Sequence, residues 1–406
     1  MIKVIHIGDL HLGGAYPEKA SASIEFLLGQ IGDSTSPAFE PDMVVCTGDT
    51  TERGLHVHSD HLKPLLSLIR GLKCPCLFLQ GTPSHEPYGF LRNVEDASGM
   101  LISVYDEPRV DISPINGWAN GDNGKADKVA IATLPALTRY KLMEWVERRA
   151  GAPMDSPEDN VTFLLDWIAS QWKDFSGPKI LLGHWTIVGC TTSTGQTLYG
   201  SDIAVSLEQL KGCGANAVLC GHIHKVQQWD LDGMLVSYCG SSHNCNWGEL
   251  DEKSFSVIQF DESTGKVASF ERVRYPHKPM VKVVVEFTGE QVDGEWKYLS
   301  SCPDLPNQET VLTLTAEYEV KVCYTVPKEI STHVDDMYVR VLFHRLGIEL
   351  AAVEGTTRAT DRERIADIGD KQTTRQQYVA VCEAKGEPPR DGALAKADQI
   401  DEEVRG

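Results

Sequence analysis

The chain has 406 residues and a formal net charge of −20, with 41% hydrophobic and 24% charged residues. This is the composition of an ordinary globular protein, long enough for roughly two or three domains. Because phosphate backbones are bound mainly by lysine and arginine, the acidic balance excludes a nucleic-acid binder that relies on net charge alone. Any role on nucleic acid then needs metal ions, a local basic patch or a partner.

The eleven cysteines are scattered and lie mostly in apolar runs. Their odd number and their spacing favour reduced thiols in a cytosol-like compartment, and no pair of CxxC motifs indicates a structural zinc site. No apolar stretch approaches the length of a transmembrane span, and His6 and Asp9 interrupt the amino-terminal stretch, so we expect no signal peptide. The sequence therefore predicts a soluble, cytoplasmic protein.

Short β-branched runs alternate with helical patterns from residue 1 to about 275, which is typical of an α/β domain. The expected strands are Lys3–Ile7, Met43–Thr47, Cys76–Gln80, Lys128–Thr133, Lys179–Gly183 and Ala217–Cys220. The helices expected between them are Ser23–Gln30, His61–Arg70, Arg139–Arg149 and Asn160–Trp172. The strands that follow without helices, Val226–Leu231, Met234–Tyr238 and Ser254–Phe260, indicate that sheet closes on sheet.

The pattern changes near residue 280, where a small β-α-β domain is expected. Its elements are the runs Val281–Phe287 and Val311–Thr325, the helical Val334–Leu346 and the short Glu349–Val353. After about residue 357 charges are dense and apolar residues sparse, except in two amphipathic stretches. Such a tail is expected either to be disordered or to fold against a partner. The predicted domains are therefore 1–278 and 279–356, followed by a charged tail over 357–406.

Five stretches place acidic or imidazole side chains directly after an expected strand. They are "HIGDLHLGG", "VVCTGDT", "QGTPSHE", "ILLGHW" and "VLCGHIH". Because the carboxyl ends of parallel strands meet at one crevice, these side chains should converge on one site. Aspartate and histidine together suit transition metals. If each D-x-H or H-x-H segment is extended, its two side chains share a face, so the pattern predicts a two-metal centre.

The order D-x-H, GD, GH and GHxH resembles the motifs of the calcineurin-like metallophosphoesterases. Within that superfamily the chain is most similar to the SbcD-type nucleases of double-strand-break repair, on "HIGDLHLGG" and "LLGHWTIVG". The resemblance implies a four-layer α/β/β/α sandwich, a small α+β capping domain and a helical tail that docks on an SbcC-like ATPase. It also implies a homodimer that cuts DNA with two divalent ions, most often Mn²⁺.

The resemblance also assigns residue roles. Asp9, His11 and His224 would hold one ion, His184 and His222 the other, and Asp49 would bridge both. His85, oriented by Glu86, would stabilise the transition state and protonate the leaving 3′ oxygen of the substrate.

One motif departs from the family pattern. The family has Gly-Asn-His before an acidic residue, whereas "GTPSHE" has no asparagine. Ser84 stands directly before His85, so its hydroxyl is the group expected to replace the missing ligand, directly or through a water. Two alternatives stay open: a phosphatase or small-molecule phosphodiesterase on the same metal site, and a non-catalytic scaffold with a degraded metal centre.

Overall fold

The computed structural model describes residues 1–406 apart from 32–36, 55–61, 88, 90, 93–101, 113–128, 194–202, 293–294, 302–317, 328–330, 332–333, 346, 359–378, 380–392, 395 and 399–406. The chain divides into two compact units, Met1–Pro279 and Met280–Gly406. The first part of the strand predicted at Val311–Thr325 and nearly all of the predicted tail lie outside the described residues.

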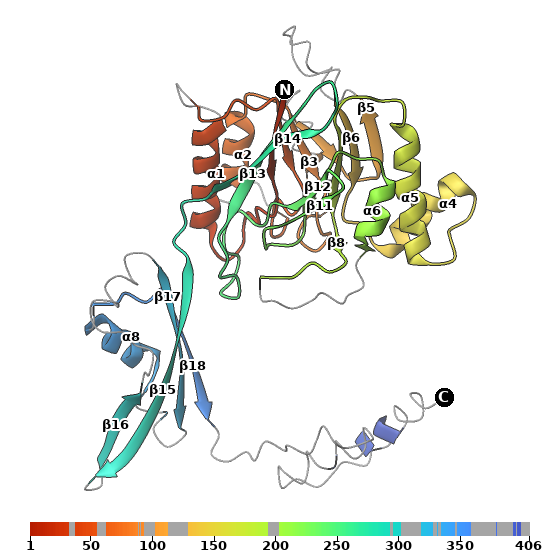
Figure 1. The fold of residues 1–406 in the computed structure, drawn as a ribbon. Coiled ribbons are helices and arrows are strands. Elements are labelled where there is room, and N and C mark those ends of the chain that lie inside the picture. The colour runs from red at the N-terminus through yellow and green to blue at the C-terminus, as the bar shows by residue number, and fades with distance from the viewer. Residues whose placement is uncertain are drawn as a thin grey trace. The chain divides into compact units, whose positions relative to one another are not determined.

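The described part of the first unit contains two six-stranded sheets (Figure 1). The first has the order β14-β13-β1-β2-β3-β4 and consists of β1 (Ile2–Ile7), β2 (Met43–Cys46), β3 (Cys76–Leu79), β4 (Ile102–Tyr105), β13 (Ser254–Phe260) and β14 (Val267–Arg274). Strands β1 to β4 are parallel, so their carboxyl ends lie at one edge of the sheet. Strands β13 and β14 complete the sheet in antiparallel pairing.

The second sheet has the order β11-β12-β10-β7-β6-β5. It consists of β5 (Arg109–Ile112), β6 (Ala130–Leu134), β7 (Lys179–His184), β10 (Ala217–Gly221), β11 (Gln227–Leu231) and β12 (Met234–Tyr238). Strands β6, β7, β10 and β12 are parallel, which again places their carboxyl ends at one edge. A short parallel pair, β8 (Thr186–Ile187) with β9 (Ala204–Val205), follows β7.

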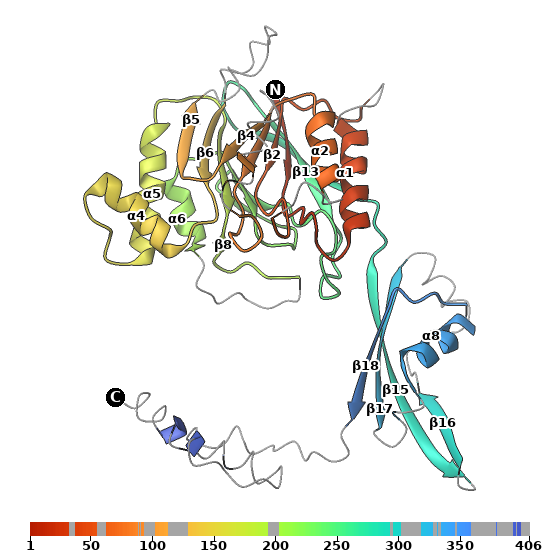
Figure 2. The same cartoon turned by 180° about the vertical axis from the view of Figure 1, so that it is seen from behind.

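Helices cover the outer faces of both sheets (Figures 1 and 2). Helices α1 (Pro17–Ile31) and α2 (Leu62–Gly71) belong to the core of the first sheet, and α4 (Arg139–Ala150), α5 (Pro157–Gln171) and α6 (Leu207–Gly212) to that of the second. Alternation along β1 sends Ile5 and Ile7 toward the helices and Val4 toward the other sheet. The predicted α/β/β/α sandwich is confirmed.

The ends of two helices follow from local sequence signals. The Thr138 hydroxyl accepts a hydrogen bond from the backbone N–H of Lys141 and caps the start of α4, which ends at Gly151 in a left-handed conformation with φ 86°. Ser156 caps α5 in the same way and is followed by Pro157, a residue preorganised for the first helical position. These caps fix where each helix begins, and Gly151 fixes where α4 ends.

The second unit contains a four-stranded sheet in the order β16-β15-β17-β18. Its elements are β15 (Met280–Val292), β16 (Glu295–Ser301), β17 (Glu319–Pro327), α8 (Asp336–Arg345) and β18 (Ala352–Arg358). Strands β17 and β18 are parallel and α8 connects them, which gives the β-α-β arrangement. Val339 and Phe343 of α8 are buried in the core of this unit. None of the helices in the described ranges has the length and apolarity needed to cross a lipid bilayer.

The contact between the two sheets predicts a large effect of Leu182→Ala on stability. Leu182 is 0% exposed and belongs to the core that both sheets share. Its truncation should lower the free energy of unfolding by about 2–5 kcal/mol, measured by chemical denaturation. Val188→Ala, at a side chain that is 56% exposed, should change it by less than about 0.5 kcal/mol. Equal losses in the two variants would contradict this account of the core.

Candidate metal centre

Five strand ends from both sheets meet at one place. Asp9 and His11 follow β1, Asp49 follows β2, and the loop that begins at Gly81 follows β3, whereas His184 ends β7 and His222 and His224 follow β10. Among the described residues, donor atoms within 4.8 Å of one another form four overlapping groups, which are Asp9, His11 and Asp49; Asp49, His184 and His222; His11, His224 and Cys245; and His11, Glu52 and His85. The structure thus brings the six predicted ligands together, with Asp49 in two of the groups.

The Asp49 carboxylate lies between the two sheets. Its Oδ2 is 3.3 Å from Nε2 of His184 and 4.0 Å from Nε2 of His11. Burial alone would raise the pKa of Asp49, but the charge and hydrogen bond of His184, and then the charge of His11, hold it below its usual range. The same contacts raise the pKa of His184 to about 9 against the effect of its burial. A cation bound here would therefore replace a proton on the imidazole.

Asp9 and His224 complete the other side of the centre. Nε2 of His224 is 2.9 Å from Nε2 of His11 and 3.9 Å from Oδ1 of Asp9. Asp9 is 0% exposed and accepts a hydrogen bond of 2.9 Å from the backbone N–H of His222. Burial raises the pKa of Asp9. Two ring nitrogens and a buried carboxylate that face one another are costly without a cation between them.

Three of the histidines are held by their second ring nitrogen. The distances from Nδ1 are 2.6 Å for His11 to Oε2 of Glu52, 2.8 Å for His224 to Oε1 of Glu249, and 2.7 Å for His184 to the carbonyl oxygen of Thr47. Because each acceptor favours a proton on Nδ1, Nε2 is the ring nitrogen that would bind an ion at the centre. Such outer contacts are typical of histidines that bind metals.

Glu249 has further contacts that fix its position. Lys253, buried beside it, donates to its Oε2 over 2.8 Å, and the backbone N–H of Cys245 donates to the same oxygen over 3.2 Å. Burial would raise the pKa of Glu249, but the hydrogen bond and charge of His224, and then the charge of Lys253, lower it to about 2. The loop that carries Cys245 and Glu249 is thereby fastened to His224. Sequence motifs gave no signal for Glu52, Glu249 or Thr47.

Four of the six ligand candidates have left-handed backbone conformations. The φ angle is 48° at Asp9, 44° at His11, 47° at Asp49 and 86° at His222. The expectation that Asp9-x-His11 and His222-x-His224 are extended is therefore wrong at three of these positions. Such conformations cost about 1–3 kcal/mol each and persist where the surroundings impose them. Here the backbone turns sharply so that side chains from separate loops point to one centre.

Glycines permit the close approach of these loops. An added Cβ at Gly81 would lie 2.0 Å from the backbone nitrogen of Asp49, and one at Gly48 would lie 2.3 Å from Nδ1 of His184. A Cβ at Gly221 would lie 2.1 Å from the carbonyl oxygen of Thr47. All three distances are shorter than any tolerated contact, so no other residue type fits without moving a ligand.

The hydroxyl that reaches the centre from the β3 loop belongs to Thr82. Oγ1 of Thr82 is 3.2 Å from Oδ2 of Asp49 and 3.2 Å from Nε2 of His184, and its backbone N–H donates to Oδ1 of Asp49 over 2.6 Å. Ser84, the predicted substitute for the asparagine, is exposed to solvent. Thr82 directly follows Gly81, as the asparagine does in the family motif, and the added residues come after it. The structure therefore favours Thr82 over Ser84 as the neutral oxygen of the site.

The structure corrects the role expected for Glu86. Its carboxylate is buried and accepts hydrogen bonds from the backbone N–H groups of Thr50 and of Gly81, the latter over 2.6 Å, rather than from His85. Burial and the charge of Asp49 raise the pKa of Glu86 to about 7. Glu86 thus ties the β3 loop to the β2 loop.

His85 is positioned by Glu52 instead. Nδ1 of His85 is 3.2 Å from the carbonyl oxygen of Glu52 and 3.6 Å from its Oε2. The His85 and His11 rings meet edge to face with centroids 5.0 Å apart. His85 lines a cavity of about 420 Å³ together with His11, Asp49, Thr82 and His224, so it faces the same space as the ligand candidates.

The family of calcineurin-like phosphoesterases matches residues 2–226, more than half of the chain, and the chain belongs to this family. No curated protein matches the chain. Among solved structures it is similar to the anchor of the inner membrane complex of Plasmodium (14% identity, 68% of this chain and 89% of that one, TM-score 0.40) and to phosphopantetheinyl hydrolase of Mycobacterium tuberculosis (15%, 59% and 90%, 0.32). It is also similar to a putative 5′-nucleotidase of Staphylococcus aureus (11%, 68% and 54%, 0.41).

Family membership identifies the protein as a metal-dependent phosphoester hydrolase. The donor set agrees with this, since carboxylate oxygens and imidazole nitrogens together suit divalent transition metals. The carboxylates of Asp9 and Asp49 are buried and face ring nitrogens from both sheets. Their negative charge would balance the positive charge of a bound cation.

The contacts of Thr82 predict that Thr82→Ala weakens the binding of a divalent ion at Asp49 and His184. We expect a loss of affinity for Mn²⁺ of about tenfold or more by titration calorimetry, because a neutral oxygen beside both groups is removed. The matched variant Ser84→Ala, at an exposed hydroxyl of the same loop, should bind as the wild type does. The reverse result would restore Ser84 as the substitute for the asparagine.

The contacts of Glu52 predict a similar loss for Glu52→Ala. Without the carboxylate that holds Nδ1 of His11, the affinity for Mn²⁺ should fall about 10–100-fold, as is usual for such outer groups. Glu252→Ala, at an exposed carboxylate paired with Arg274, provides the control. Unchanged affinity in Glu52→Ala would show that the position of His11 does not depend on this contact.

Proposed function

We propose that the protein is a DNA nuclease that hydrolyses phosphodiester bonds with two divalent ions, and that these ions are Mn²⁺. The observation that carries the proposal is the arrangement of six aspartate and histidine donors in overlapping groups, two of which share Asp49, with His85 lining the same cavity. Asp9, His11 and His224 would hold one ion, and His184, His222 and Thr82 the other. The bound ions would polarise the phosphodiester oxygens and activate water at neutral pH.

The protein's own residues account for the remaining steps. Asp49 would be shared by the two ion sites, because its carboxylate lies near both His11 and His184. The Nδ1–H group of His85 donates a hydrogen bond to the carbonyl oxygen of Glu52, so Nε2 is the ring nitrogen that faces the substrate. In the imidazolium form of His85, the proton on Nε2 would pass to the leaving 3′ oxygen. Glu52 therefore acts on His85 and His11 together.

DNA as the substrate is supported by the motif resemblance and by a local basic element. Helix α4 carries Arg139, Lys141, Arg148 and Arg149 against Glu144 and Glu147, a local excess of positive charge in a chain of net charge −20. Its first residue lines a cavity that also contains His184 and His222. A phosphate backbone that approaches the centre would meet these cations.

The partners proposed for this nuclease rest on the resemblance alone. We infer a homodimer that works with an SbcC-like ATPase in DNA end processing, recombination or repair, with the tail after residue 357 as the docking segment. The net charge of −20 is consistent with this arrangement, because such a partner would contribute much of the affinity for DNA.

The decisive experiment is digestion of end-labelled linear DNA with Mn²⁺, alongside 4-nitrophenyl phosphate as a generic phosphomonoester. Asp49→Ala should abolish DNA cleavage, because both ion sites lose their shared ligand, whereas Asp174→Ala, an exposed carboxylate, should not. Hydrolysis of the phosphomonoester without DNA cleavage would identify a phosphatase. If neither substrate reacts, even with a candidate ATPase, the proposal of a nuclease is overturned in favour of a scaffold.

A further inference from the structure

A second cavity adjoins the metal centre, and His85 is not among the residues that line it. It has a volume of about 330 Å³, and Thr82, His184 and His222 form part of its wall. Thr82 and His222 also line the cavity that contains His85, so both cavities border the metal centre. Its volume lies in the range of about 300–1,000 Å³ that is usual for sites of small organic groups.

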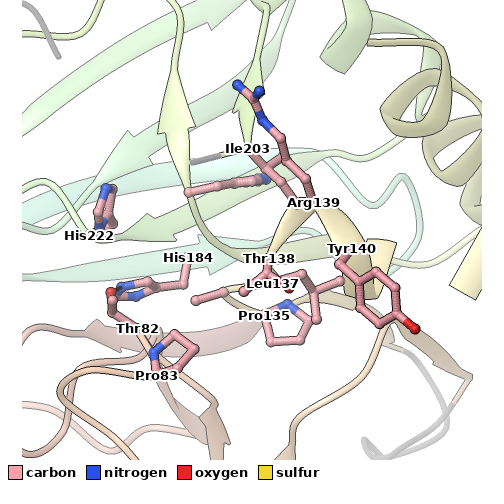
Figure 3. Close-up of a pocket in the computed structure, with 12 residues that line it drawn as sticks. Thr82, Pro83, Pro135, Leu137, Thr138, Arg139, Tyr140, His184, Ile203 and His222 are labelled. Carbon is pink, nitrogen blue, oxygen red and sulfur yellow. Dashed lines mark hydrogen bonds between the residues drawn. The ribbon is translucent and has the colours of Figure 1, made fainter. Parts of the chain in front are cut away.

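The walls of this second cavity are mainly apolar. Opposite the histidines they are formed by Pro135, Leu137 and Ile203, and Pro83 lies beside Thr82 (Figure 3). Pro135 and Ile203 are buried, so their positions are fixed by the surrounding core. A phosphate ion would gain no binding free energy from apolar walls. A flat group with apolar faces would gain binding free energy there, because its surface would be removed from water.

The first residue of α4, Arg139, lines this cavity and carries a positive charge. Arg139 follows the helix cap, its side chain is exposed, and it forms no ion pair with any described residue. Figure 3 shows the Arg139 and Tyr140 side chains extending in different directions from the side of the cavity opposite His184 and His222. An unpaired guanidinium near an apolar cavity suits a ligand that is apolar at one end and anionic at the other.

We propose that this cavity binds the nucleobase of the nucleotide next to the scissile phosphate, and that Arg139 binds the neighbouring phosphate of the same strand. The inference rests on the proposed nuclease function and assigns the side of the cut from the position of His85. Since the proton donor lies in the other cavity, the leaving group lies there too. The nucleoside that keeps the phosphate on its 5′ oxygen then occupies the cavity beside His184.

The test uses a labelled oligonucleotide with a single abasic residue, and compares cleavage of the bonds on its two sides by the wild-type protein with Mn²⁺. Cleavage of the bond on the 5′ side of the abasic residue should slow about tenfold relative to the same bond in the intact strand, because the base that fills the cavity is missing. The bond on its 3′ side should be affected less. Equal rates at abasic and intact positions would overturn the proposal.

Leu137→Trp tests the cavity itself, because the larger side chain fills the space for the base. In this variant the ratio of the rates for intact and abasic strands should approach one, with metal content measured to show that the centre is retained. Ile112→Trp, which adds the same group at an exposed position of β5, should keep the wild-type ratio. A wild-type ratio in Leu137→Trp would exclude the cavity as the site of the base.

Binding provides a readout that does not require cleavage. Thymidine 5′-monophosphate should bind more tightly than deoxyribose 5-phosphate by calorimetry, and Leu137→Trp should remove the difference. Arg139→Ala should weaken the binding of a dinucleotide 5′-phosphate more than the binding of the mononucleotide. If the wild type cuts no DNA at all, the nuclease function fails, whereas DNA cleavage that is indifferent to the base overturns the cavity proposal alone.

Discussion

The site depends on the Asp49 carboxylate, which follows strand β2 of the first sheet and lies between His11 and His184. It contacts His184 of the second sheet, faces His11 of its own sheet and accepts hydrogen bonds from Thr82. This position exists only because the sheets pack face to face with their parallel strands ending at the same side. The metal centre therefore requires this packing of the two sheets, because a shift of either sheet would move the donor atoms apart.

Most of the sandwich could be predicted, because its central strands are short apolar runs and its helices are periodic. What was missed has weak patterns. Helix α6 spans only six residues, β5 is half exposed along its length, and α1 begins six residues before the predicted Ser23, where small and charged residues hide the period although Lys19 and Ala20 are buried. Such elements are determined by their neighbours in space, which a local pattern does not contain.

The six ligand candidates were predictable because each lies in a short motif after an apolar strand. The groups that orient them were not. Glu249 is 25 residues from His224, and in a chain with 58 acidic residues nothing local distinguishes it or Glu52. Thr82 was passed over because Ser84 is nearer to His85 in sequence, whereas in space the position after Gly81 decides. The family resemblance also suggested Glu86 as the partner of His85, but the Glu86 carboxylate accepts hydrogen bonds from the backbone.

The β3 loop shows how such a site can change in evolution. At Gly81 the smallest side chain would collide with Asp49, yet directly after Thr82 the loop is longer than the family motif, and the added Ser84 is exposed to solvent. The loop therefore tolerates additional residues on its solvent side, but no additional side-chain atoms at Gly81, which faces Asp49. Insertions here would accumulate as neutral variation, while single-atom changes at a residue without chemistry of its own would be removed by selection.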